Sequence, residues 1–160
     1  MRRETGSWLS GPAAALGGSP VEQEWRGQRL GLPRNGPGSL ASRGRRLVAL
    51  LADLIIAGLI AGLFTHASLA DQSAMLRQND WGVLVWFVMT VVAVSFFGFT
   101  PGLGMLGLRV ARLDGARQVG PLRAIPRTVL VGLIIPAVIW DADLRGLHDK
   151  ATGTAVVSFR

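Results

Sequence analysis

The residue with the clearest chemical significance is Asp53, the single charged residue in the 18-residue apolar run from Leu47 to Phe64. A carboxylate within a membrane-spanning helix costs about 2.5–3.5 kcal/mol on insertion scales, so it normally faces other protein and has a partner or a function. Two interpretations follow. Asp53 either exchanges a proton or a cation, or it fixes helix packing by holding an arginine. The candidates for that arginine are Arg123, Arg127 and Arg145.

Three other polar residues are candidates to act with Asp53. Arg46 lies seven residues earlier, which places it on the same face of a helix but too far away for a direct pair. We expect the side chain of Arg46 to extend back to the membrane interface. Thr90 and Ser95 lie near the depth of Asp53 in a second apolar run, and they are possible hydrogen-bond partners.

Two sequence patterns resemble ligand sites but lack what those sites require. Residues 102–107 match G-x-G-x-x-G, yet an apolar span precedes them, a strand-like segment follows, and the expected acid is replaced by Arg127. The segment beginning at Asp141 resembles a calcium-binding loop, but Arg145 and Thr152 occupy its fifth and twelfth positions, where oxygen ligands are needed. We therefore predict neither a dinucleotide nor a calcium site.

The chain also lacks the residue types of most catalytic and metal centres. It has no cysteine and just two histidines, and the pair His148–Asp149 consists of sequence neighbours, which rarely converge on one metal. We find no nucleophile next to a base. The sequence therefore predicts a non-enzymatic protein without cofactor or metal.

Two apolar runs are long enough to cross a membrane. Residues 47–64 would form about 27 Å of helix, close to the roughly 30 Å hydrocarbon core, and residues 81–99 contain no charge at all. A third apolar segment, residues 124–140, is shorter and contains Pro136, so it either spans the membrane or is re-entrant. We predict a mainly α-helical membrane fold with two firm transmembrane helices and this short third segment.

Small residues in the first run favour close helix packing. Gly58 and Gly62 form a G-x-x-x-G pattern, and each follows an alanine. This face packs either against the second span or against another copy of the chain, and we favour the first.

Arginines define the predicted orientation. Residues 1–46 contain eight arginines and residues 101–128 contain five, whereas residues 65–80 contain one. The positive-inside rule therefore places the N-terminus and residues 101–128 in the cytoplasm. Residues 1–42 are rich in Gly, Pro and Ser, so we predict that they form a disordered cytoplasmic tail. A membrane domain over residues 43–160 is predicted to follow this tail.

The formal net charge of +7 suggests an anionic partner. No nucleic-acid-binding module accompanies the arginines, which cluster beside the spans, so we predict no nucleic-acid partner. Anionic lipid at Arg43, Arg45 and Arg46 is the simpler expectation.

Short strands are predicted outside the spans. Residues 108–113 alternate apolar and basic side chains, and the turn at Asp114–Gly115 followed by residues 118–120 indicates a β-hairpin. Residues 155–159 also favour a strand. We expect a small cytoplasmic β-hairpin or strand cap.

Several segments together resemble one family. Arg46 before LVALLADLII, TPGLGMLGLRV at 100–110, and RGLHDKATGTAVV at 145–157 resemble the RDD family of small bacterial membrane proteins, and residues 6–12 and 29–33 resemble its short high-GC branch. The resemblance covers roughly residues 43–157. The arginine and two aspartates that give the family its name would be Arg46, Asp53 and Asp149. Leu103 departs from the family, which usually has a basic residue there.

The resemblance implies one polar cluster near the inner face. Its members would be Arg46, Asp53 and Asp149, and possible supporting residues are Ser95, Arg127 and His148. We expect a multi-pass protein of the bacterial plasma membrane, forming a homo-oligomer or part of a larger membrane complex. It would act as an accessory or assembly factor, or else as an oligomeric transporter of cations or small solutes that uses Asp53 for exchange.

Overall fold

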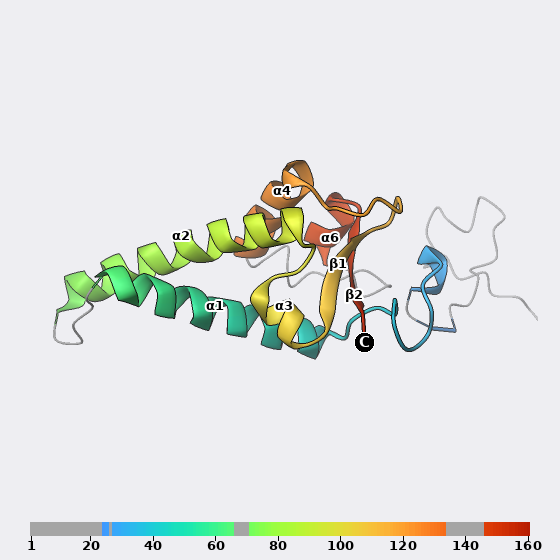
Figure 1. The fold of residues 1–160 in the computed structure, drawn as a ribbon, viewed down its shortest axis with the longest axis horizontal. Coiled ribbons are helices and arrows are strands. Elements are labelled where there is room, and N and C mark those ends of the chain that lie inside the picture. The colour runs from blue at the N-terminus through green and yellow to red at the C-terminus, as the bar shows by residue number, and fades with distance from the viewer. Residues whose placement is uncertain (1–23, 26, 66–70, 134–145) are drawn as a thin grey trace, which may run out of the picture.

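The computed structural model describes residues 24–25, 27–65, 71–133 and 146–160. Two long antiparallel helices form a hairpin, and the helices and strands that follow them in the chain form a cap at one end of it (Figure 1). The elements follow in the order η3 (Gln28–Leu30), α1 (Arg43–Thr65), α2 (Gln72–Phe96), α3 (Pro101–Met105), β1 (Leu108–Arg112), α4 (Pro121–Gly132), α6 (Leu147–Ala151) and β2 (Thr154–Ser158).

The hairpin helices α1 and α2 are long and apolar enough to cross a membrane, which confirms the prediction of a mainly helical fold with two such helices. Their 23 and 25 residues correspond to about 35 and 38 Å. Just 22% of the most apolar window of each helix is buried in the protein. A helix in the core of a soluble domain would be mostly buried, so this exposure suits contact with lipid.

The second helix starts earlier than the sequence predicted. It covers Gln72–Phe96 rather than residues 81–99, because Asp71 caps it by accepting a hydrogen bond from the Ser73 amide at 2.9 Å. The helix ends before Gly98, whose φ of +76° breaks the helical path. Residues 72–80, which lie between the two predicted spans, are therefore helical.

Small side chains allow α1 and α2 to pack closely. Ala57 and Ala61 are almost fully buried on the face of α1 that meets α2. Gly58 lies beside them in α1. A Cβ added to Gly82 of α2 would lie 3.8 Å from the Cα of Gly58. A Cβ added to Gly62 would lie 3.3 Å from the Gln78 amide nitrogen. The predicted small-residue face thus serves packing within the chain.

The two strands of the cap pair with each other. β1 and β2 are antiparallel, with Val110 opposite Val156. The predicted hairpin arm at residues 118–120 is wrong, because these residues form no strand and β1 pairs with β2 instead. All five residues of β2 are buried, so the strand forms the centre of the cap. Its core includes Val94, Leu108 and Val156.

The chain just before α1 also joins the cap, which differs from the disordered tail predicted over residues 1–42. Leu40 forms a bridge to Val157, and the Ala41 amide donates to the Val156 carbonyl at 3.0 Å. The Trp25 indole donates to the Leu32 carbonyl at 3.0 Å. The ordered part of the described chain therefore begins before residue 43, and residues 1–23 lie outside the described residues.

Helix α4 covers the first part of the predicted third apolar segment. It begins at Pro121 after Gly120 and packs against α2. Arg127 is buried on its inner face. A helix of 12 residues is too short to span a bilayer on its own. The rest of the segment, residues 134–140, lies outside the described residues.

Candidate functional site

A fully buried carboxylate, Asp149, lies at the centre of the contact between the cap and the helix hairpin. It accepts hydrogen bonds from Arg46 Nη1 at 3.1 Å, from Arg127 Nε at 3.0 Å and from the Thr154 hydroxyl at 3.3 Å. His148 Nε2 lies 3.5 Å from the same carboxylate. The contact joins α1, α4, α6 and β2, so a single side chain ties together four elements.

The charges around Asp149 keep it ionised. Burial opposes ionisation, but the electrostatic influence of Arg127, His148 and Arg46, with the hydrogen bond from Arg127, outweighs it and holds the pKa of Asp149 below its usual value. The guanidinium groups are themselves buried, with 8% of the Arg46 side chain and 7% of the Arg127 side chain exposed. Buried ion pairs of this kind depend strongly on each partner, because removing one leaves a charge without compensation.

The second buried carboxylate, Asp53, binds the start of helix α3. It accepts hydrogen bonds from the Gly102 amide at 2.7 Å and from the Thr100 hydroxyl. Thr100 also caps α3 by accepting a hydrogen bond from the Leu103 amide at 3.2 Å. The first amides of a helix have no partner within it, so the carboxylate supplies an acceptor where one is needed.

Gly102 makes this approach of α3 to α1 possible. A Cβ at this position would lie 2.2 Å from the Ala49 carbonyl oxygen and 3.0 Å from the Asp53 carboxyl carbon. Any larger residue would therefore push α3 away from α1. The Thr-Pro-Gly sequence at 100–102 combines a cap, a helix start and a close contact.

Some of the predicted partners of Asp53 are found elsewhere. Arg127 binds Asp149, and Arg123 binds Asp114 at 3.1 Å. The remaining candidate, Arg145, lies outside the described residues. The prediction that a side chain from Arg123 or Arg127 would pair with Asp53 is therefore wrong.

Two further sequence predictions are corrected by the site. Ser95 and Thr90 are buried, but the described chain shows no hydrogen-bond partner for either hydroxyl. Arg46 does not extend back to the interface, because it folds inward to Asp149 and to the Val156 carbonyl at 3.2 Å. The role of Thr100 was missed by sequence reasoning, although a threonine before Pro-Gly is itself a helix-start signal.

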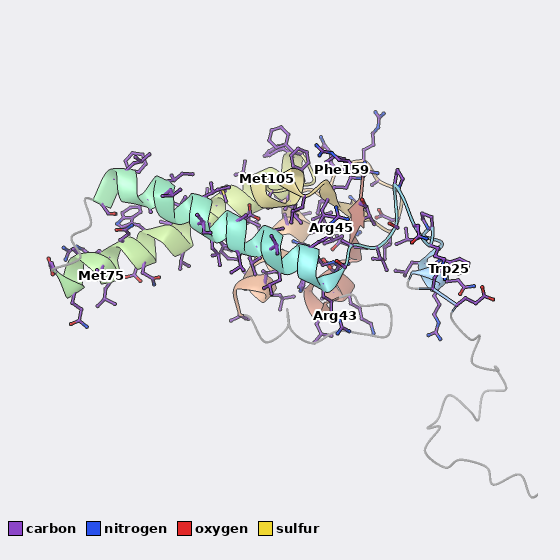
Figure 2. All side chains as sticks on the ribbon, turned by 90° about the horizontal axis from the view of Figure 1, so that it is seen from below. Trp25, Arg43, Arg45, Met75, Met105 and Phe159 are labelled. Carbon is purple, nitrogen blue, oxygen red and sulfur yellow. The ribbon has the colours of Figure 1, made fainter. Side chains whose placement is uncertain are left out.

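Both carboxylate centres border one cavity. Its volume is about 410 Å³, and Arg46, Asp53, Thr100, Arg127 and His148 all line it. The cavity lies between the hairpin and the cap, at the end of α1 where Figure 2 shows Arg43 and Arg45. Among the described residues, no three His, Cys, Asp or Glu side chains gather as metal ligands. The arrangement can thus hold polar groups together and admit a small ligand.

The chain has a hairpin of two long apolar helices, with the buried ion pairs of Asp149 with Arg46 and Arg127 at one end. This arrangement fits a small membrane protein. Comparison with known proteins agrees with this class. The model of the RDD family matches residues 40–153, and the chain belongs to that family. No curated protein and no solved structure matches the chain.

Proposed function

We propose that this chain is a non-enzymatic accessory or assembly factor of a membrane complex in the bacterial plasma membrane. The observation that carries the proposal is that Arg46, Asp53 and Asp149 all bind groups within the chain. Asp149 joins the cap to α1, and Asp53 joins α3 to α1. The three residues of the family signature then maintain a shape, which is what a scaffold requires.

The size of the hairpin supports the same proposal. Two helices cannot enclose a pathway across a membrane by themselves. Their outward faces carry large apolar side chains, such as Leu59 at 68% exposed and Phe64 at 77% exposed. In a bilayer these faces are available to lipid or to the helices of other proteins, including further copies of this chain.

The distribution of cations supports a cytoplasmic cap. Arg43, Arg45 and Arg46 lie at the cap end of α1, whereas the described residues near the other end of the hairpin include Asp71 and Asp80 beside a single arginine. We infer from the positive-inside rule that the N-terminus and the cap face the cytoplasm. Anionic lipid headgroups would then lie beside the arginines at the start of α1.

The test compares Asp53→Asn with Asp80→Asn, an equal loss of charge at an exposed position at the far end of the hairpin. If the protein is an accessory factor, Asp53→Asn lowers its abundance and the amount of native membrane complex on blue native gels. Cation-driven proton movement in vesicles stays at its background level with either variant. Unchanged complex with Asp53→Asn would contradict the proposal.

Transport is the second candidate function, and one observation favours it: Asp53 lines the cavity. In this alternative an oligomer forms the pathway, and Asp53 exchanges a proton for a cation. Purified protein in vesicles would then move protons in response to a cation gradient, and Asp53→Asn would abolish the movement. Absence of such movement from the wild-type protein would exclude this alternative.

A further inference from the structure

The cavity between the hairpin and the cap has features that its role in packing does not explain. Most of its wall is apolar, including Leu47, Leu50, Leu103 and Val131. A volume of about 410 Å³ falls within the range of small-molecule sites, which are mostly apolar with a few polar groups. Asp53 and Arg46 bind protein groups at its edge. The apolar wall therefore remains available to a ligand.

Two polar groups in the wall have no partner in the described chain. The Trp86 indole nitrogen and the Thr90 hydroxyl are buried, and each residue is just 5% exposed. Both side chains line the cavity. A buried donor without an acceptor costs roughly 1–3 kcal/mol in proteins, so the packing behind this wall is not optimised for stability alone.

The charge of the wall favours an anionic ligand. Arg43, Arg46 and Arg127 line the cavity, whereas Asp53 is the sole acidic lining residue in the part of the chain that the structure describes. Asp149 lies behind the wall, where it binds both Arg46 and Arg127. The arginines thus outnumber the carboxylates around the cavity, and the exposed Arg43 lies at its rim.

The order of these groups along the hairpin matches one class of molecule. Arg43 is at the start of α1, and the apolar run begins four residues later at Leu47. The close approach of Gly58 and Gly82 puts Thr90 at the level of Leu50, about 10 Å along the helix from Arg43. From the rim inward, the cavity therefore presents a cation at Arg43 and then apolar side chains from Leu47 to the level of Thr90.

We propose that the cavity binds one anionic glycerophospholipid. Its phosphate lies at Arg43, and one acyl chain fills the apolar part against Leu50 and Val131. This inference is independent of the accessory role, because a bound lipid would occupy the same cavity in a scaffold or in a transporter.

The test uses native mass spectrometry of the full chain in detergent, with phosphatidylglycerol and phosphatidylcholine of identical acyl chains in equal amounts. The wild-type protein retains one phospholipid and prefers phosphatidylglycerol about ten-fold. Arg43→Gln reduces that preference about five-fold, as expected for the loss of one cation beside the phosphate. Its control, Arg109→Gln, leaves the preference unchanged, because Arg109 is an exposed arginine of β1 that does not line the cavity.

A second set of variants fills the cavity. Val131→Phe removes retention of both lipids, whereas the same change at Val129, which lies outside the lining, has no effect. Leu47 is exposed at the mouth of the cavity, so Leu47→Trp narrows the mouth without disturbing the core. We expect it to abolish lipid retention as Val131→Phe does. It therefore tests the proposal even if Val131→Phe does not fold. Equal retention of the two lipids, displacement of the phospholipid by oleate, or undiminished binding by Leu47→Trp would each overturn the proposal.

Discussion

Replacing Asp149 by asparagine tests the central contact of the fold most directly. The change keeps the size of the side chain and removes its charge, so Arg46 and Arg127 remain buried without a counter-charge. Breaking a buried pair by removing one partner typically destabilises a protein by about 3–5 kcal/mol. Because Asp149 is fully buried and is bound by both guanidinium groups, we expect a loss within that range.

The assay is equilibrium unfolding in mixed micelles, followed by circular dichroism while the fraction of denaturing detergent is raised. Asp114→Asn is the matched control, since Asp114 also pairs with two arginines but is exposed, and we expect little change from it. Combining Asp149→Asn with Arg127→Met should destabilise less than the two single changes added together. The proposed role of Asp149 in holding the two arginines would be refuted if Asp149→Asn were as stable as the wild type. It would also be refuted if the losses of stability from the two single changes simply added up in the double variant.

Three further predictions concern the same contacts. Gly102→Ala should destabilise the fold by about 1–3 kcal/mol or more in the same titration, because its Cβ would overlap the α1 backbone, whereas Gly58→Ala has open space and should not. Thr100→Val should cost about 1–2 kcal/mol, since α3 loses its cap; an unchanged midpoint would contradict this. The stabilisation by ionised Asp149 is complete above its unfolded pKa of about 3.9 and is lost as the pH falls through its lower folded pKa. The stability difference between wild type and Asp149→Asn should therefore shrink below about pH 4. A constant difference down to pH 2 would contradict a stabilising role for the ionised Asp149 carboxylate.

The apolar helices could be predicted from the sequence because lipid imposes a simple requirement. A run such as residues 47–64 must bury its backbone polar groups within a helix and present apolar side chains outward, whatever the rest of the chain does. The start of α2 was harder to locate, because a local cap at Asp71 extends the helix beyond the apolar stretch. Hydropathy marks the part of a helix within lipid and not its full length.

The partners of the buried charges could not be predicted from spacing. Arg46 and Asp149 are 103 residues apart, and their contact depends on the path of the cap. The Asp53 carboxylate binds a backbone amide and a hydroxyl, which leave no charge pattern in the sequence. The resemblance suggested that these residues lie near one another, but not that Asp149 binds two arginines while Asp53 binds the start of α3.

The order in which the strands are synthesised has a consequence for assembly. β2 follows every other element along the chain, yet it lies between β1 and the segment at Leu40. With the cap in the cytoplasm, as proposed above, Arg46 would still be without Asp149 while the hairpin enters the bilayer, so its full charge would add to the positive-inside signal. Asp149 of α6 would pair with the same guanidinium once it has been synthesised, and one side chain would thereby serve two successive stages of assembly.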